Sequence, residues 1–274
     1  LTRILSKRLG EILGQPIVVE NRTGAQGSLG VGVALKAKPD GYTVAALPGD
    51  TMVINPHILG DAGWNTLTDV VPVVRGITHS MILTAHPSLP VRTIKDVESL
   101  VRANPGKFSY ASSGTQPQVM GEYFKLLKKI DLLHVPFNGS GPASLAAVSG
   151  TTNLMISSGA GSIPHITSGK LRGIAVLGKE RSEAVPDVPS AAEAGFPELA
   201  DLVQWYGYGV PVGTPPAIVK KLNAAFVQSL QDPDVQRSLR AAGMTPAPNT
   251  PEEFAQVIKN DYERWGKIVK QTRV

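Results

Sequence analysis

The 274-residue chain contains no cysteine. Disulfides, thiolate metal sites and cysteine nucleophiles are therefore excluded, and the chain is compatible with either an oxidising or a reducing compartment. Aromatic residues make up only 5% of the sequence, and no apolar run approaches the roughly 20 residues that a membrane-spanning helix needs. What remains is a globular composition, because 42% hydrophobic residues supply a core and 28 Gly and 22 Pro are spread between periodic segments as short loops.

Charged residues are also sparse, at 18% of the sequence. Lysine and arginine exceed aspartate and glutamate by 27 − 22 = 5, which gives a mild positive potential that favours an anionic ligand. The basic residues are scattered, as Lys36, Arg92 and Lys128 illustrate, without a dense block or interleaved aromatics. We therefore expect no nucleic acid among the partners.

The signatures of nucleotide, acyl-transfer and metal chemistry are missing. The glycines at 24, 27, 30 and 32 do not have the Gly-x-Gly-x-x-Gly spacing, and no Gly-Lys pair is followed by the Ser or Thr of a P-loop. Neither Ser113 nor Ser140 has both flanking glycines of a nucleophile elbow. The five histidines show no i, i+3 or i, i+4 pairing. We expect no cofactor, no metal site and no catalytic residue.

The pattern that is present is a short apolar strand that runs into a loop of Gly and small hydroxyl residues and then into a helix. It occurs four times, and its loops hold the candidate ligand-binding residues: Pro48, Gly49, Asp50 and Thr51; Ser112, Ser113, Gly114 and Thr115; Asn138, Gly139 and Ser140; and Ser157, Ser158 and Gly159. A helix N-terminus has up to four unpaired N–H donors and about half a positive charge. Several of them converging on one cleft bind an anion without a catalytic side chain, so the pattern indicates binding rather than chemistry.

Two further side chains have alternative interpretations. Asp50 either binds a cationic group of the ligand or interacts only with the dipole of its own helix. Trp205, on a predicted strand at 205–210, either forms a wall of the ligand site or packs in the core. The loop at 138–142 is the sharpest candidate, because Pro142 suits the start of a helix and leaves the preceding backbone N–H groups free.

The order of strands and helices along the chain predicts an α/β fold with mostly parallel sheets. The expected elements include strands at 16–20 and 205–210 and helices at 94–103, 217–230, 234–242 and 251–270, with Thr93 and Thr250 as N-caps and Glu253 completing a capping box. Breaks at 86–90 and 211–216 enclose one βα series. We therefore predict that residues 1–85 and 212–274 form lobe I, that residues 86–211 form lobe II, and that the ligand cleft lies between the lobes.

The chain resembles the Bug (TctC-like) family of extracytoplasmic solute receptors over its whole length. The residues that carry the resemblance are QPIVVENR at 15–22, PDGYT at 39–43, INP at 54–56, HPSLP at 86–90, ANPGK at 103–107, YASSG at 110–114, HVPFNGSGPA at 134–143, PHITSGKLR at 164–172, PDVP at 186–189, AG at 194–195 and PVGTP at 211–215. Each motif is modest by itself. Their order along the chain makes the resemblance specific.

The resemblance implies a type II, Venus-flytrap periplasmic binding protein with two lobes. Such a protein is a monomer without enzymatic activity that holds a small organic acid and delivers it to the membrane subunits of a tripartite tricarboxylate transporter. Family members grip the carboxylate through backbone amides and ordered water from βα loops. The four loops named above match those positions.

Three departures from the family pattern bear on the ligand. The family's first strand and its Gly-rich ligand loop are expected to precede Leu1, the segment 114–121 lacks the customary His, and Ser157 stands where many members have Asp. A missing acidic group weakens selection for an ammonium group and suits a plain mono- or dicarboxylate, aromatic acids included, although Asp50 could compensate. The alternatives are an α/β hydrolase or transferase whose catalytic residue lies upstream, and a signalling sensor that engages a kinase.

Overall fold

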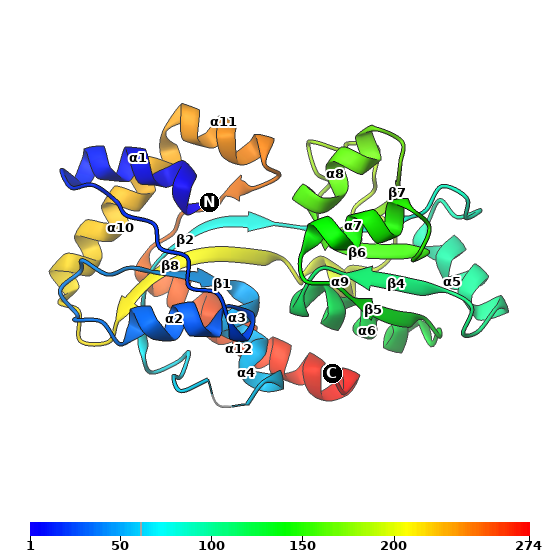
Figure 1. The fold of residues 1–274 in the computed structure, drawn as a ribbon, viewed down its shortest axis with the longest axis horizontal. Helices are drawn as coiled ribbons and strands as arrows, with labels where there is room; N and C mark the ends of the chain where they lie inside the picture. Colours follow the sequence, from blue (N-terminus) through cyan, green and yellow to red (C-terminus); the bar gives the residue numbers. More distant parts are fainter. Residues whose placement is uncertain (61) are drawn as a thin grey trace. The chain divides into compact units, whose positions relative to one another are not determined.

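The computed structural model describes residues 1–60 and 62–274. The chain forms two compact units, each assembled from segments that are distant in sequence (Figure 1). Unit 1 comprises Leu1–Thr78 and Trp205–Val269, and unit 2 comprises His79–Gln204 and Lys270–Val274. Each unit contains one sheet with helices packed against it, so the predicted α/β class is confirmed.

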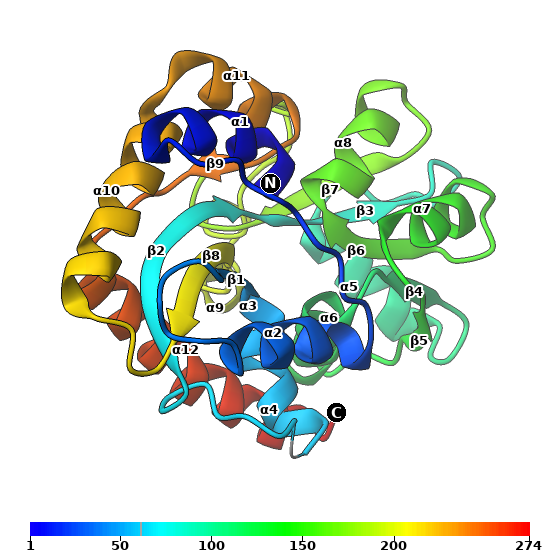
Figure 2. The ribbon, with the colours of Figure 1, turned by 60° about the vertical axis from the view of Figure 1, so that its left-hand side comes forward.

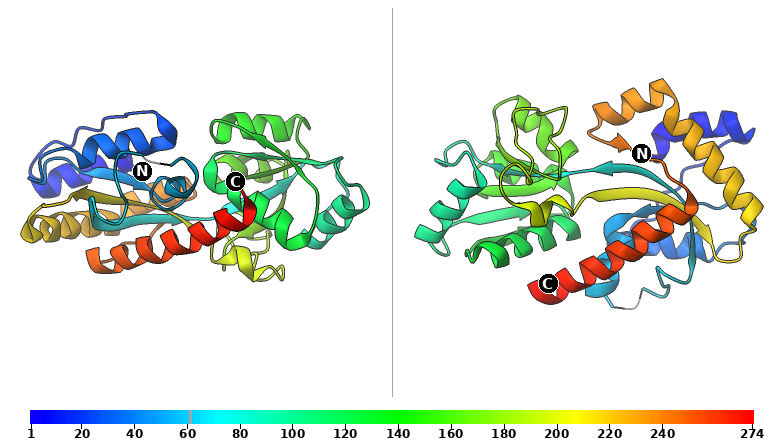
Figure 3. Two further views of the ribbon diagram at one scale, coloured as in Figure 1. Left: turned by 90° about the horizontal axis from the view of Figure 1, so that it is seen from below. Right: turned by 180° about the vertical axis from the view of Figure 1, so that it is seen from behind.

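Unit 1 is built around a four-stranded sheet with the order β1-β8-β2-β9. Its strands are β1 (Ala45–Pro48), β2 (Val70–His79), β8 (Gln204–Pro211) and β9 (Thr245–Pro246). Its helices are α1 (Thr2–Leu13), the 3-10 turn η1 (Ala25–Gly27), α2 (Ser28–Leu35), α3 (Gly49–Val53), α4 (Asn55–Ile58), α10 (Pro216–Gln231), α11 (Pro233–Ala241) and α12 (Pro251–Thr272). Figure 2 shows α1, α10 and α11 side by side, and Figure 3 shows α12 as one continuous helix.

The core of unit 1 follows from helical spacing on α1 and alternation on the strands. Leu5 and Leu9 lie one turn apart on α1 and are buried in the same core cluster as Ile77 of β2. Tyr208 of β8 stacks on Phe226 of α10 with the ring centroids 4.3 Å apart. These contacts anchor α1 and α10 to the sheet.

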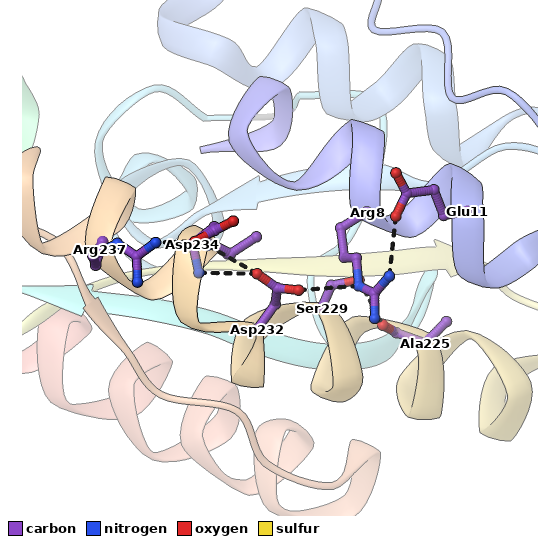
Figure 4. Close-up of polar contacts among 8 residues, drawn as sticks. Arg8, Glu11, Ala225, Ser229, Asp232, Asp234 and Arg237 are labelled. Carbon is purple, nitrogen blue, oxygen red and sulfur yellow. Dashed lines mark hydrogen bonds and ion pairs between the residues drawn. The ribbon is translucent and has the colours of Figure 1, made fainter.

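An ion pair also joins α1 to the start of α11 (Figure 4). Arg8 Nε lies 3.2 Å from Asp232 Oδ2, and Arg8 donates a second contact of 3.0 Å to Glu11. Asp232 is at the same time the N-cap of α11, because its Oδ1 accepts hydrogen bonds from the backbone N–H groups of Asp234 and Val235. One carboxylate therefore closes a helix start and fixes a neighbouring helix.

Unit 2 contains a five-stranded sheet with the order β5-β4-β6-β3-β7. Its strands are β3 (Met81–Ala85), β4 (Ser109–Ser112), β5 (Leu133–Pro136), β6 (Leu154–Ser158) and β7 (Arg172–Leu177). Its helices are α5 (Ile94–Ala103), α6 (Thr115–Lys128), α7 (Ser140–Val148), α8 (Gly159–Thr167) and α9 (Pro197–Ala200). Small residues on α7, among them Ala143 and Ala147, pack against Ala111 and Met155 of the sheet, so this helix approaches the strands closely.

The predicted capping box at Thr250 is present, and the predicted N-cap Thr93 forms a second one with Asp96. Thr93 accepts a hydrogen bond from the N–H of Asp96, whose carboxylate accepts in return from the N–H of Thr93. Thr250 and Glu253 exchange the same pair of hydrogen bonds at the start of α12. The helix at 94–103 has the predicted bounds.

The sheets are more mixed than the sequence predicts. In unit 1, β1 runs antiparallel to β8 and β2 runs antiparallel to β9. In unit 2, β4 is parallel to β5 and β6, whereas β3 is antiparallel to β6 and β7. Strands β3 and β8 each follow a segment of the other unit, and β3 runs against β6 and β7 while β8 runs against β1.

The predicted strand at 16–20 is wrong, because the segment forms no ladder. Its side chains still alternate between half-buried and exposed positions, since Ile17 and Val19 are half-buried while Val18 is 81% exposed. A strand needs a hydrogen-bonded neighbour, and the described strands of unit 1 pair with one another instead.

The units divide between Thr78 and His79 and between Gln204 and Trp205, earlier in the chain than the predicted lobe boundaries at 85/86 and 211/212, and Lys270–Val274, predicted in lobe I, belongs to unit 2. The reason is strand pairing. Strand β3 belongs to the sheet of unit 2, where it pairs with β6 and β7. Strand β8 pairs with β1 and belongs to the sheet of unit 1.

Candidate functional site

Three of the four predicted loops meet at one edge of the unit 2 sheet. The strands β4, β5 and β6 are parallel neighbours, and each is followed closely at its carboxyl end by a helix, α6, α7 or α8. The carboxyl ends of parallel strands share an edge, which is where α/β proteins bind ligands. The structure therefore brings together the candidate residues of unit 2: Ser112, Ser113, Gly114, Thr115, Asn138, Gly139, Ser140, Ser157, Ser158 and Gly159.

Direct contacts link these loops. Ser157 Oγ donates to Ser113 Oγ at 3.1 Å, and Ser140 Oγ lies 3.3 Å from Ser158 Oγ. Gly161, in the first turn of α8, allows the close approach, because a Cβ there would lie 2.6 Å from both Ser140 Cβ and Ser157 Oγ. The hydroxyl groups form one cluster, and only a glycine at this position leaves room for it.

The three helices begin without side-chain caps. The N-caps of α6, α7 and α8 are Gly114, Gly139 and Ser158, and no side chain at these positions accepts a hydrogen bond from the helix N–H groups. The loop segments 112–115, 138–141 and 157–160 contain no charged residue. This arrangement can hold a small anion through neutral donors and helix dipoles.

Ser112 serves a supporting role that the sequence did not reveal. It is 1% exposed, and its Oγ lies 2.8 Å from His134 Nε2 on the neighbouring strand β5. Burial lowers the pKa of His134, Lys125 lowers it further and Glu122 opposes both effects, so the imidazole is neutral at pH 7. The pair fixes the end of β4 just before the Ser113 loop.

The loop at 48–51 lies in unit 1 and is internally paired. Asp50 Oδ1 accepts a 2.9 Å hydrogen bond from the N–H of Thr51. Burial raises the pKa of the Asp50 carboxyl above its usual value, against the opposing effect of that hydrogen bond. Burial, together with the nearby Asp50 carboxylate, raises the pKa of Tyr206 to about 12. The local contacts are those of a carboxylate that serves its own helix.

Near this loop, Gln26 and Asn55 were not predicted as functional. Thr51 Oγ1 and Asn55 Nδ2 both donate to the carbonyl oxygen of Gln26, each at 3.1 Å. Gln26 lies in η1, where its φ of 51° is in the left-handed region. The glycines at 24 and 27 were the available sequence signal, because they flank a backbone turn that an ordinary helix start does not need.

Trp205 is buried in unit 1 rather than presented by it. Its side chain is 3% exposed, its Nε1 donates to Asp261 Oδ2 at 2.9 Å, and its ring meets Phe254 edge-on at 5.1 Å. A Cβ at Gly49 would lie 3.2 Å from the Trp205 ring, so this indole packs against the start of α3. The candidate residues Gly49, Asp50 and Thr51 lie in the first turn of α3, and Pro48 is its N-cap. A direct contact of Trp205 with ligand stays a prediction.

Metal binding and membrane insertion find no support in the described residues. No group of three His, Asp or Glu side chains within residues 1–60 and 62–274 is placed to hold a metal ion. No helix in that part of the chain is both long and apolar enough to cross a bilayer.

The model of the tripartite tricarboxylate transporter family receptor, TctC, matches residues 1–274. The chain belongs to this family. Among its TctC-family relatives, BugT of Bordetella pertussis is 31% identical over 275 residues, which are 99% of this chain and 84% of that protein. The predicted resemblance to the Bug family is confirmed.

Solved structures agree with the TctC assignment. A protein described as a periplasmic transporter is 40% identical, with a TM-score of 0.89 over 98% of this chain and 90% of that one. An R. palustris protein with adipate is 28% identical, with a TM-score of 0.89 over 99% and 91%. MatC from Rhodopseudomonas palustris with bound malate is 30% identical, with a TM-score of 0.84 over 98% and 92%. These neighbours confirm the periplasmic binding protein fold.

Proposed function

We propose that this TctC-family member is a monomeric periplasmic receptor that captures a small mono- or dicarboxylate and delivers it to tripartite tricarboxylate transporter subunits. The observation that carries the proposal is the cluster of uncapped helix starts and serine hydroxyls at the edge of β4, β5 and β6. Similar proteins solved with adipate and malate support the choice of ligand class.

The chemistry of the cluster favours a carboxylate over other small ligands. Hydrogen bonds from neutral donors to a charged acceptor contribute about 1.5–3 kcal/mol each, and each helix dipole adds about 0.3–1 kcal/mol. No acidic side chain lies in the three loops of unit 2, so they offer no partner for an ammonium group. We therefore propose that the ligand lacks an α-amino group.

A hydrolase is the second candidate, because Ser112 Oγ and His134 Nε2 lie within the 2.8 Å of a nucleophile and its base. Two observations favour the receptor. The Ser112 hydroxyl is buried, and the nearby Glu122 accepts from Tyr110 instead of orienting His134. We propose that the protein binds acids stoichiometrically and leaves them unchanged.

Calorimetric titration with mono-, di- and tricarboxylates, aromatic acids and amino acids tests the proposal. Saturable binding of an acid is expected, and Ser113→Ala and Ser140→Ala should each weaken it by about 1–3 kcal/mol. Ser149→Ala is the matched control, because this exposed serine lies in unit 2 outside the cluster. Silence towards every acid, or hydrolysis of an ester that Ser112→Ala abolishes, would refute the receptor.

A further inference from the structure

Two loops meet at one end of unit 1, where the blue chain after α2 lies beside the yellow start of α10 (Figures 1 and 2). Gly41 permits this contact, because a Cβ at that position would overlap the side chain of Ile218. Its φ of 82° is in the left-handed region, which also favours glycine. The segments 36–43 and 212–221 therefore form one packed surface, the loop platform.

The loop platform exposes apolar side chains. Tyr42 is 84% exposed, the highest value among the large hydrophobic side chains of the described residues, and Val212 is 58% exposed. The segments also touch beside Val212, because a Cβ at Gly213 would lie 3.8 Å from Pro39 Cγ. Three prolines of the platform are exposed as well, namely Pro39, Pro215 and Pro216. Apolar side chains that gather at one place on a surface indicate an interaction site.

Lysines dominate the charge of the loop platform. Its two segments contain four exposed lysines and one aspartate, namely Lys36, Lys38, Lys220, Lys221 and Asp40. Within residues 1–60 and 62–274, none of the four lysines forms an ion pair.

The acidic groups at the loop platform are engaged locally. Asp40 accepts a 3.0 Å hydrogen bond from the N–H of Tyr42. Asp69, whose carbonyl accepts from the N–H of Val212, uses its carboxylate to accept from Asn65 and Thr68. Four lysines thus stand against these two aspartates, and the surface is positive.

The charge and composition of the loop platform distinguish among partners. A second copy of the chain is unsuitable, because a symmetric contact would set lysines against lysines. Protein interfaces favour arginine and are depleted in lysine, whereas the two segments contain four lysines and no arginine. At a lipid surface, lysine stems cover apolar groups while their ammonium groups meet the head groups, and a tyrosine ring suits the same boundary.

We propose that the loop platform docks on a bilayer that contains anionic phospholipids. Each lysine near such a surface strengthens binding by about fivefold, and exposed apolar side chains add to this attraction at the level of the head groups. Tyr42 precedes β1 and the candidate loop at 48–51 follows it, so docking and that loop use opposite ends of the strand. The chain is held at the membrane surface without a spanning helix.

Co-sedimentation of the whole chain with lipid vesicles tests the proposal. One set of vesicles contains equal parts of phosphatidylglycerol and phosphatidylethanolamine, and the other contains phosphatidylcholine alone. The chain is expected to sediment with the anionic vesicles only. The bound fraction should fall as the salt concentration rises from about 10 mM to about 1 M, because the screening length falls from about 30 Å to about 3 Å.

Two results would overturn the proposal at this stage. Equal binding to both kinds of vesicle would mean that anionic lipid is not recognised. Binding to neither kind at low salt would exclude a lipid surface and leave an acidic protein surface as the partner of the loop platform.

A pair of lysine variants tests whether the loop platform is the docking surface. Lys220→Gln combined with Lys221→Gln should weaken binding to the anionic vesicles by about twentyfold. Lys259→Gln combined with Lys267→Gln is the matched control, because it removes the same charge from exposed lysines of α12. Equal losses in the two double variants would show an effect of net charge alone and would overturn the assignment of the surface.

Exposed valines provide the apolar counterpart of this test. Val212→Ser should weaken vesicle binding by about threefold, because part of a valine side chain no longer leaves water. Val18→Ser is the control, since Val18 is exposed in unit 1 outside the two segments, and an equal loss there would contradict the proposal. Carboxylate titrations of the same samples report separately on the proposed function, because none of these residues lies in the candidate loops.

Discussion

The candidate loops of the two units differ in the hydrogen bonds that their residues make. In unit 2 the helices α6, α7 and α8 begin without side-chain caps, and the loop hydroxyls of Ser113 and Ser140 pair with those of Ser157 and Ser158. In unit 1 the loop at 48–51 satisfies itself: Asp50 accepts from Thr51, Thr51 donates to Gln26, and Trp205 donates to Asp261.

This contrast separates donors that hold the fold from donors that are left for a ligand. Side chains close three helix starts, since Thr93, Asp232 and Thr250 cap α5, α11 and α12. Where the chain instead places glycine at the N-cap, the N–H groups keep their capacity for an outside acceptor. Unit 2 therefore carries the larger share of the proposed anion recognition.

Removing the Trp205 side chain should produce the largest change in stability, and it tests whether the contacts around the 48–51 loop of unit 1 are structural. Trp205→Ala is expected to lower the free energy of unfolding by about 3–5 kcal/mol, since it leaves a cavity beside Phe254 and deprives the partly buried Asp261 of its donor. Urea denaturation measures the change. A loss below about 1 kcal/mol would mean that this indole is not a core residue.

A substitution at Gly161 can disrupt the close packing of α8 against Ser140 and Ser157 in unit 2. Gly161→Ala should cost about 1–3 kcal/mol of stability and weaken carboxylate binding by about tenfold, because the new methyl group overlaps Ser140 and Ser157. Gly141→Ala is the matched control, since a Cβ at Gly141 meets no atom within 4 Å. Denaturation and calorimetry of both variants decide the matter, and equal behaviour would contradict the packing argument.

The structural helix starts can be tested at Asp232. Asp232→Ala should lower the free energy of unfolding by about 1 kcal/mol, because α11 loses its cap and Arg8 loses an ion-pair partner. Asp234→Ala serves as the control, since Asp234 pairs with Arg237 at the exposed surface (Figure 4), where such a pair contributes about 0–1 kcal/mol. A larger loss in the control than in Asp232→Ala would overturn this ranking.

The smallest effect is expected from the charge of Asp50. Its pKa is raised in the folded state, so the folded protein binds this proton more readily than the unfolded chain, and ionisation of Asp50 at neutral pH costs stability. Asp50→Asn should therefore be more stable than the natural sequence at pH 7, and the difference should shrink as the pH falls towards the ordinary value of about 3.8. Urea midpoints at several pH values test this, and a gain that grows at low pH would reverse the sign.

Local signals predicted the parts of the fold that depend on neighbouring residues. The bounds of α5, the N-cap at Thr93 and the capping box at Thr250 follow from residues three or four positions apart. The serine loops of unit 2 were found because strand, loop and helix follow one another directly. The strand at 16–20 failed for the complementary reason, since a ladder depends on a partner that alternation alone does not identify.

Contacts between distant residues were beyond the sequence. Nothing in the pattern around Trp205 indicates Asp261 as its acceptor, and nothing around Ser112 indicates His134 as the partner of its hydroxyl. The lobe boundaries depend on strand pairing in the same way, because β3 and β8 look like continuations of the preceding series until their neighbours are known.

The open position at Gly141 gives the protein a use as a measuring device. Because the chain has no cysteine, Gly141→Cys would introduce its one thiol at an exposed site in the first turn of α7, next to Ser140. A solvatochromic dye attached there would sense the dehydration of the serine cluster when an acid binds. The same glycine-rich geometry that leaves donors open would thus convert ligand occupancy into an optical signal.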